Sequence, residues 1–321
     1  MIEYIDIIRT IAISFLITII LGPIIIPLLR RLKIGQSIRE EGPKSHLKKS
    51  GTPTMGGIII FLSLLITLTT SNMLNKDMYV LILATFGFGM IGFVDDYIKV
   101  VKRRNLGLKA YQKLIGQIVL AVLLAMYQSS TSVLGTKLIV PFLTNQYLDL
   151  GILYIPFIAF VVVGTVNSVN LTDGLDGLAS GVTLIVLSFF GLIALNWGMG
   201  SISIFSTALA GACLGFLVHN AHPAKVFMGD TGSMGLGGAV SAIAILLNLP
   251  LVIPIVGGIY FIEALSVIIQ VTSFKLTGKR VFLMSPLHHH YEQKGWKETK
   301  VVAVFWSITV ILCLVGIFSL N

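Results

Sequence analysis

Two neighbouring carboxylates, Asp95 and Asp96, follow the apolar run 86–94 in a chain that holds only 14 acidic residues. Ionisable groups beside hydrocarbon are costly and, where they occur, generally have a function. Adjacent positions of a helix point about 100° apart, so we expect the two carboxylates to contact different partners. A solvated helix end would also explain the pair, but its position at the end of an apolar segment favours a functional site.

A polar side chain recurs at every third position between residues 167 and 176: Asn167, Asn170, Asp173 and Asp176. On a helix this spacing gives a slowly drifting polar stripe. Gly174 and Gly177 are equally consistent with a broken helix or a tight turn that lets backbone approach a ligand. A glycine-rich turn alone does not explain two amides within an apolar run, because an unpaired buried amide costs free energy. The segment therefore predicts a binding site.

Asp230 is the only acid in the segment 219–233. The glycines beside it resemble a phosphate-binding loop only weakly, because no Gly-Lys-Ser/Thr follows them. For the later Gly235, Gly237 and Gly238, close packing of membrane helices is the better explanation.

Three consecutive histidines, His288, His289 and His290, lie near the end of the chain. They look like a metal site, but side chains at successive positions fan apart, so we do not expect one ion to take all three. Imidazoles that hydrogen-bond a phosphate or a reacting oxygen fit the pattern better.

Together these segments offer carboxylates, amides, imidazoles and many cations, which suits a divalent ion that binds phosphates. Mg²⁺ prefers oxygen ligands, usually one or two carboxylates with phosphate oxygens and water. Cys213 and Cys313 both fall in apolar segments, so we expect them to pack in the core without forming a disulfide or a thiolate metal site. Phosphoryl transfer needs mainly positioning and charge neutralisation from a protein.

The composition shows which elements must carry these residues. Apolar residues make up 55% of the chain, charged residues 12%, and the mean hydropathy is +0.92, which is typical of a polytopic membrane protein. Because a span needs about 20 apolar residues, we predict an all-α fold with about ten transmembrane helices. They lie near residues 5–29, 54–71, 78–95, 112–128, 151–168, 178–195, 201–219, 233–249, 251–273 and 300–319.

The basic residues predict the orientation of these helices, because short loops rich in Lys and Arg stay in the cytoplasm. With the N-terminus outside, the inner loops 30–53, 95–113, 167–178, 220–232 and 274–300 hold 20 of the 23 basic residues. The candidate site residues fall on or beside the same loops, so we expect the chemistry at the cytoplasmic face. The outer loop 129–150 contains turn-forming residues that suggest a small hairpin. We find no domain boundary and predict a single membrane-embedded domain, 1–321.

Five runs of this sequence closely resemble the phospho-N-acetylmuramoyl-pentapeptide transferase family, part of the polyprenyl-phosphate N-acetylhexosamine-1-phosphate transferase superfamily. The runs are 49–57, 93–96, 167–177, 226–233 and 286–292. They occur in the family's order, over nearly the whole chain, and with the same ten-span plan. Each run alone is moderately specific for the family, and the five runs together are strong evidence of the resemblance.

The resemblance implies transfer of phospho-MurNAc-pentapeptide from UDP-MurNAc-pentapeptide to undecaprenyl phosphate, giving lipid I and UMP, with Mg²⁺ as cofactor. This is the first membrane step of peptidoglycan synthesis in the bacterial cytoplasmic membrane. Both substrates are anionic, so an inward-facing basic surface would attract them. The expected partners are therefore these two substrates, the lipid bilayer and a second copy of the chain in a homodimer, with no nucleic acid.

The resemblance also assigns site residues by their matching positions. The residues expected to act in catalysis are Asp95, Asp96, Asp230, His288, His289 and His290. Those expected to bind substrate are Lys49, Asn167, Asn170, Asp173, Asp176, Asn220 and Phe227. Asp230 matches the family's magnesium ligand, Asp95 is the candidate base or orienting group, and Phe227 would stack on uracil.

Two other functions are consistent with parts of the sequence. A polyprenyl-phosphate GlcNAc-1-phosphate transferase for another surface polymer would share most of these motifs, but the run 286–292 favours the muramoyl branch. An anion transporter would be expected to distribute charges through the bilayer. Here Glu263 is the only acid well inside a predicted span, which disfavours transport.

Overall fold

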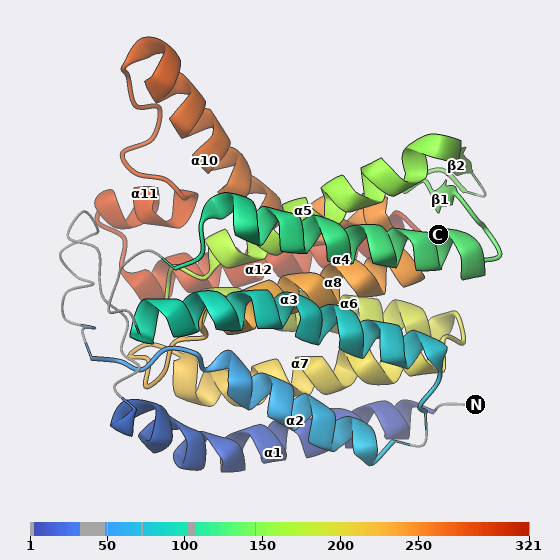
Figure 1. The fold of residues 1–321 in the computed structure, drawn as a ribbon, viewed down its shortest axis with the longest axis horizontal. Coiled ribbons are helices and arrows are strands. Elements are labelled where there is room, and N and C mark those ends of the chain that lie inside the picture. The colour runs from blue at the N-terminus through green and yellow to red at the C-terminus, as the bar shows by residue number, and fades with distance from the viewer. Residues whose placement is uncertain are drawn as a thin grey trace.

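The computed structural model describes residues 3–32, 49, 51–71, 73–101, 107–144 and 146–320. Within these ranges the chain is a bundle of helices with one two-stranded sheet (Figure 1). The long helices are α1 (Tyr4–Arg31), α2 (Gly57–Thr69), α3 (Lys76–Val101), α4 (Ala110–Thr131), α5 (Tyr154–Thr172), α6 (Leu178–Asn196), α7 (Gly200–Asn220), α8 (Gly229–Leu246), α10 (Gly258–Thr277) and α12 (Glu298–Phe318). The shorter elements are β1 (Lys137–Ile139), β2 (Tyr147–Asp149), η2 (Gly151–Leu153), η3 (Pro250–Val252), α9 (Ile253–Val256) and α11 (Leu287–Gln293).

Each predicted span overlaps one of the long helices, and by length and composition 8 of these helices of the described chain could cross a membrane, which confirms an all-α polytopic membrane protein. The other two long helices do not meet both criteria. Helix α2 has only 13 residues, and the first turns of α8 carry polar residues and glycines, which lower its hydropathy. A helix satisfies its own backbone hydrogen bonds, as hydrocarbon requires. Both chain ends lie at the same end of the bundle (Figure 1).

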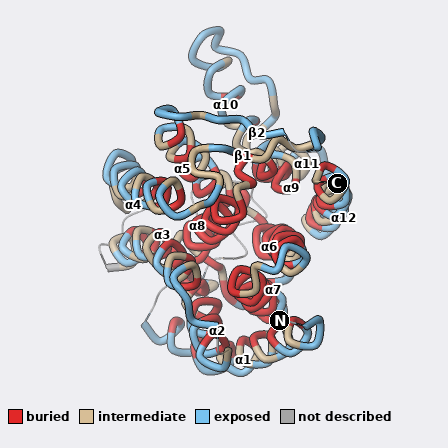
Figure 2. The backbone as a smooth tube through the Cα atoms, turned by 90° about the vertical axis from the view of Figure 1, so that its right-hand side faces the viewer, coloured by how far each residue is buried: buried red, intermediate tan, exposed pale blue. Residues whose placement is uncertain are grey.

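The core of the bundle lies around α6, α7 and α8 (Figure 2). In the most apolar stretch of α7, 83% of the residues are buried, and in that of α6, 72%, whereas the share is 28% in both α1 and α4. Glycines on α8 permit the close packing, because a Cβ on Gly235 would collide with Phe61 of α2 and a Cβ on Gly238 with Phe88 of α3. This confirms that the later glycines of this segment serve packing.

The predicted span 251–273 is broken in the structure. A short helix, α9, ends at Val256, and after Gly257 α10 runs away from the bundle (Figures 1 and 2). Apolar side chains along α10, among them Phe261, Ile268 and Phe274, are exposed in the isolated chain. In a membrane this surface would contact lipid.

The end of the bundle opposite to α11 carries the predicted hairpin. β1 and β2 pair antiparallel, with Lys137 opposite Asp149. Cys213 and Cys313 are free and buried, which confirms their role in packing.

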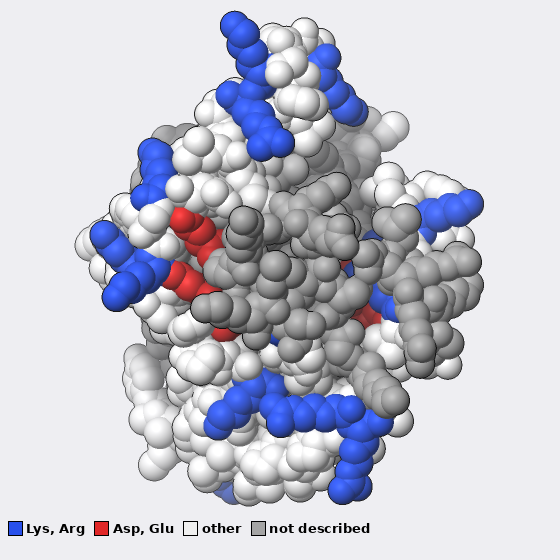
Figure 3. Space-filling view, turned by 90° about the vertical axis from the view of Figure 1, so that its left-hand side faces the viewer, with Lys and Arg blue, Asp and Glu red and all other residues white. Residues whose placement is uncertain are grey.

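Basic side chains surround the other end. Figure 3 looks onto the face that carries α11, and Lys and Arg side chains stand around its rim. Lys33, Arg39, Lys44, Lys48, Lys102, Arg103 and Arg104 of the predicted inner loops lie outside the described residues. The asymmetry agrees with the predicted orientation, which stays a prediction because no membrane is present.

Candidate active site

Asp95 is the buried centre of a group of ion pairs between α3 and α4. Its Oδ2 lies 2.6 Å from Lys99 Nζ, one turn further along α3, and 3.0 Å from Lys113 Nζ on α4. Its Oδ1 accepts a hydrogen bond of 2.7 Å from the Leu108 backbone N–H. Because an unpaired buried carboxylate costs much free energy, these three donors explain how the side chain can be only 1% exposed.

Asp96 faces a different element and caps α8. Its Oδ2 accepts hydrogen bonds from the backbone N–H and the hydroxyl of Thr231, at 2.9 and 2.7 Å, and its Oδ1 accepts one from the Asp230 N–H at 3.3 Å. The first N–H groups of a helix have no partner within it, and negative charge is favourable there. The two adjacent acids thus have different main partners, as predicted, and share only Lys99, which lies 3.9 Å from Asp96 Oδ1. The helix does not end at them but continues to Val101, because Lys99 pairs with the acids along it.

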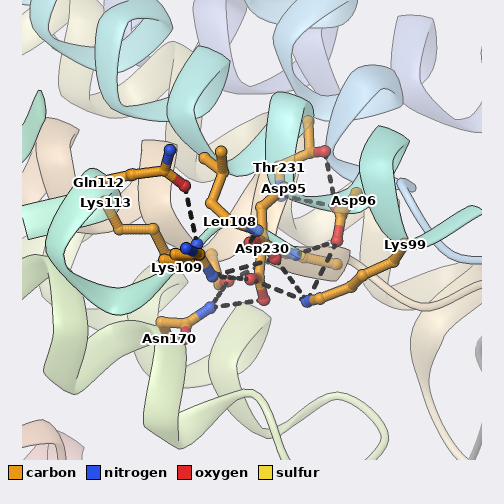
Figure 4. A network of polar contacts seen from close by, with 12 residues as sticks. Asp95, Asp96, Lys99, Leu108, Lys109, Gln112, Lys113, Asn170, Asp230 and Thr231 are labelled. Atoms are coloured by element: carbon orange, nitrogen blue, oxygen red, sulfur yellow. Dashed lines mark hydrogen bonds and ion pairs between the residues drawn. The ribbon is translucent and has the colours of Figure 1, made fainter. Parts of the chain in front are cut away.

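Asp230 joins the same lysines from the opposite side (Figure 4). Its Oδ2 lies 2.7 Å from Lys113 Nζ and 3.1 Å from Lys99 Nζ, and its Oδ1 accepts a 3.0 Å hydrogen bond from Asn170 Nδ2 on α5. The sequence suggested a loop residue, but α8 begins at Gly229, so Asp230 lies in the first turn of the helix. Gly92 permits the approach of α3, because a Cβ there would collide with the Asp230 carbonyl oxygen.

The three carboxylates are arranged so that they could hold a metal ion. One oxygen from each of Asp95, Asp96 and Asp230 lies within 4.8 Å of the other two. An all-oxygen set of this kind suits Mg²⁺. The Asp230 side chain is 19% exposed, against 1% for Asp95 and 5% for Asp96, so Asp230 is the carboxylate most accessible to an entering ion. The residues therefore fit magnesium, and Asp230 is the leading candidate for its ligand.

The predicted polar stripe is divided between a helix and a turn. Asn170 donates to Asp230 and, at 2.8 Å, to Ser233 Oγ. Asn167 lies one turn earlier and donates to Gln117 Oε1 on α4 at 2.8 Å. Helix α5 ends at Thr172 and Gly177, with a φ of 79°, precedes α6. The broken helix is thus the correct alternative.

Asp173 lies in the turn between α5 and α6. Removal from water raises the pKa of its carboxyl to about 8, and the nearby carboxylates of Asp230, Asp96 and Asp176 raise it further in the same direction. Asp173 therefore lies close to the other acids of the site, and no lysine or arginine of the described chain offsets the rise in its pKa.

Lys49 is the centre of a second group of ion pairs. Its Nζ lies 2.7 Å from Asp176 Oδ1 and 2.7 Å from Glu298 Oε1. His222 Nδ1 lies 3.2 Å from Asp176 Oδ2 and 3.3 Å from Glu298 Oε2. Asp176, His222 and Glu298 are the other set of described residues whose geometry could hold a metal ion. One member of this set is a histidine nitrogen, and Mg²⁺ prefers oxygen ligands, which makes this set the weaker candidate.

Asn220 lies at the end of α7 beside this second group, and Phe227 lies further along the chain, in the loop after α7. Asn220 Oδ1 accepts hydrogen bonds from the Gly177 N–H and the Ser180 hydroxyl, at 3.1 and 2.9 Å, so it fixes the turn that carries Asp176. The backbone N–H of Phe227 donates to the Pro53 carbonyl at 2.8 Å, and its side chain is half-buried.

The three histidines lie on α11 and have three separate partners. His288 Nδ1 lies 3.1 Å from Glu263 Oε2 on α10, and His289 Nδ1 lies 2.8 Å from Glu292 Oε2. His290 Nδ1 accepts a 3.1 Å hydrogen bond from the Leu283 N–H, and burial together with Lys294 lowers the pKa of His290. The separate partners agree with the prediction that one ion does not take all three.

Several residues of these groups were not identified as site residues from the sequence: Lys99, Lys113, His222, Glu263 and Glu298. The spacing of Asp95 and Lys99, four positions apart on a helix, was a usable signal. Glu263 was also visible as an acid inside a span. Glu298 and His222 reach the site only through the packing of α12 and α7 against the turn at Asp176, which no local pattern indicates.

Comparison with known proteins gives consistent matches. A family model described as glycosyl transferase family 4 matches residues 78–248, and a phospho-N-acetylmuramoyl-pentapeptide-transferase signature matches residues 49–61. The phospho-N-acetylmuramoyl-pentapeptide-transferase of Alkaliphilus oremlandii is 65% identical over 329 residues, covering 99% of each chain. That of Alkaliphilus metalliredigens is 64% identical over 331 residues and covers 100% of both chains. The protein of the same name from Clostridioides difficile is 54% identical over 311 residues, covering 97% of this chain and 96% of its own.

Proposed function

This chain belongs to the phospho-N-acetylmuramoyl-pentapeptide transferase family and is a phosphosugar transferase, and we propose that it makes lipid I. In this reaction phospho-MurNAc-pentapeptide moves from UDP-MurNAc-pentapeptide to undecaprenyl phosphate, and UMP leaves. The observation that carries the proposal is the group of Asp95, Asp230, Lys99 and Lys113 at one end of a membrane bundle.

Two anionic phosphate groups must approach each other in this reaction, so the site has to neutralise charge. Mg²⁺, when bound at Asp230, would neutralise the diphosphate and stabilise the departing UMP. Lys99 and Lys113 would hold phosphate oxygens at the same point. Both Asp95 oxygens already have donors, which favours a role for Asp95 in orienting the two lysines toward the lipid phosphate.

The second group of ion pairs is suited to the nucleotide. Lys49, Asp176 and Asn220 offer one cation and several acceptors beside the turn that also carries Asp173. Phe227, half-buried and attached through its backbone to Pro53, is available to stack on uracil. Asn167 and Asn170 would help to hold α4, α5 and α8 in register at the reacting phosphates.

The lipid substrate determines where the enzyme must work. Its long hydrocarbon chain stays in the bilayer, beside exposed apolar side chains such as those of α10, while its phosphate reaches the basic end. We place this end in the cytoplasm of a bacterial cell membrane, because inner loops are rich in Lys and Arg. A homodimer and a single domain over residues 1–321 complete the proposal.

The test is transfer of label into lipid. The purified protein in detergent would receive radiolabelled UDP-MurNAc-pentapeptide, with and without undecaprenyl phosphate and with and without Mg²⁺. We expect a lipid-soluble product and UMP only when all components are present. Label transferred from UDP-GlcNAc instead would establish the GlcNAc-1-phosphate alternative. No turnover with either donor in detergent, where no sealed compartment exists, would overturn the proposal and leave transport as the alternative.

A further inference from the structure

Glu263 and His288 form a buried pair between α10 and α11. Glu263 Oε2 lies 3.1 Å from His288 Nδ1, and Glu263 Oε1 accepts a 3.1 Å hydrogen bond from the His288 backbone N–H. The Glu263 side chain is 0% exposed and the His288 side chain 1%. Both carboxylate oxygens of Glu263 are thus directed to one histidine.

The other ring nitrogen of His288 faces the turn between α5 and α6. Gly174 lies there, and a Cβ on Gly174 would collide with His288 Nε2. Among the described residues, His288 Nε2 is buried without a hydrogen-bond partner. A buried polar nitrogen left unpaired costs free energy, and Asp173 and Asp176 of the candidate nucleotide site lie on the same turn. The unpaired nitrogen therefore points to a ligand at this turn.

The partners of Glu263 determine which nitrogen of His288 carries the proton. A carboxylate accepts hydrogen bonds at both oxygens and donates none, so the contact at Nδ1 requires a proton on Nδ1. In the neutral ring Nε2 then presents a lone pair.

We infer that Glu263 is a positioning residue, which fixes His288 in the Nδ1–H tautomer so that Nε2 accepts a hydrogen bond from an O–H or N–H group of the nucleotide-sugar donor. The identity of that donor rests on the proposed function. A carboxylate that fixes the tautomer of a functional histidine is a common arrangement in proteins.

The test compares Glu263→Gln with the parent by ¹⁵N NMR of histidine-labelled enzyme. Glutamine has one acceptor and one donor group, so it cannot accept from both the His288 N–H and Nδ1–H. We expect the parent to show the Nδ1–H tautomer and Glu263→Gln to move the proton to Nε2. The chain has 6 histidines, and a His288→Gln sample identifies the signal. Glu292→Gln, which acts on His289, should leave the His288 signal unchanged.

Kinetics provide the second measurement. Glu263→Gln should raise the KM for the nucleotide-sugar donor about tenfold, as expected for one lost hydrogen bond, without a matching change in the KM for the lipid. Gly174→Ala, whose Cβ would collide with His288 Nε2, should raise the same KM. An Nε2–H tautomer in the parent would overturn the inference, even if Glu263→Gln does not fold. A clear tautomer result with no transferase turnover would instead refute the proposed function alone.

Discussion

Asp95 on α3 and Asp230 on α8 are joined through the same two ammonium groups. Lys113 Nζ lies 3.0 Å from Asp95 Oδ2 and 2.7 Å from Asp230 Oδ2, and Lys99 Nζ lies 2.6 and 3.1 Å from the same atoms. The buried acid thereby fixes two cations beside the more accessible acid. We expect the phosphates and the metal ion to bind at this junction.

Removal of the Lys113 ammonium should therefore abolish most activity. Lys113→Gln leaves Asp95 and Asp230 with Lys99 as their shared cation, and one electrostatic donor of this kind contributes about 100-fold to a rate. The measurement is initial rate in detergent at saturating substrates. Lys109→Gln, at the exposed N-cap of the same helix, is the matched control, and an equal loss in both variants would contradict the assignment.

Asp96 should contribute to folding more than to chemistry. It accepts hydrogen bonds from the first turn of α8, and loss of a helix cap costs about 1 kcal/mol. Asp96→Ala should lower the thermal unfolding midpoint in detergent, and Asp96→Asn, which keeps one acceptor oxygen, should lower it less. If both variants unfold like the parent, the capping role is wrong.

Much of this architecture was predictable from the sequence. Long apolar runs require helices in lipid, so the all-α, polytopic character of the bundle followed from composition. The pairing of Asp95 with Lys99 could also have been found from helical spacing. The break at Gly257 was not predicted, because the run 251–273 is apolar enough as a whole to be taken as one span. The convergence of Lys49, Asp176 and Glu298 was not predicted either, because it depends on how α6 and α12 pack.

Asp173 should make the protein less stable as pH rises. The ordinary pKa of an aspartate is 3.8 and that of Asp173 is about 8, so between these values the folded state holds a proton that the unfolded state has lost. The free energy of unfolding then falls with increasing pH. The thermal unfolding midpoint of Asp173→Asn minus that of the parent should therefore increase as the pH rises from about 5 to about 8, in Mg²⁺-free buffer.

Asp149 provides the control for this measurement. The Thr136 hydroxyl and the Gly151 N–H lower its pKa, so its carboxyl carries no proton in either state over the same range. The midpoint difference for Asp149→Asn should stay constant between about pH 5 and pH 8. A constant difference for Asp173→Asn as well would contradict the raised pKa.

The histidines of α11 should act without zinc. His288, His289 and His290 each contact a different partner, so their ring nitrogens are not arranged around one ion. Activity at excess Mg²⁺ should survive a zinc-selective chelator, whereas His289→Ala should lose most of its rate. Stoichiometric, tightly bound zinc in the purified protein would count against this interpretation.

The division of roles between Asp230 and Asp95 is tested by titrating Mg²⁺ against the transfer rate in Asp230→Asn and Asp95→Asn. Asp230 is the accessible carboxylate of the group, so Asp230→Asn should require a higher Mg²⁺ concentration for its residual activity. Asp95 is buried and holds the lysines, so Asp95→Asn should bind the nucleotide nearly normally and lose rate with little change in that requirement. An unchanged Mg²⁺ dependence with substantial activity in Asp230→Asn would contradict the assignment of the metal ligand.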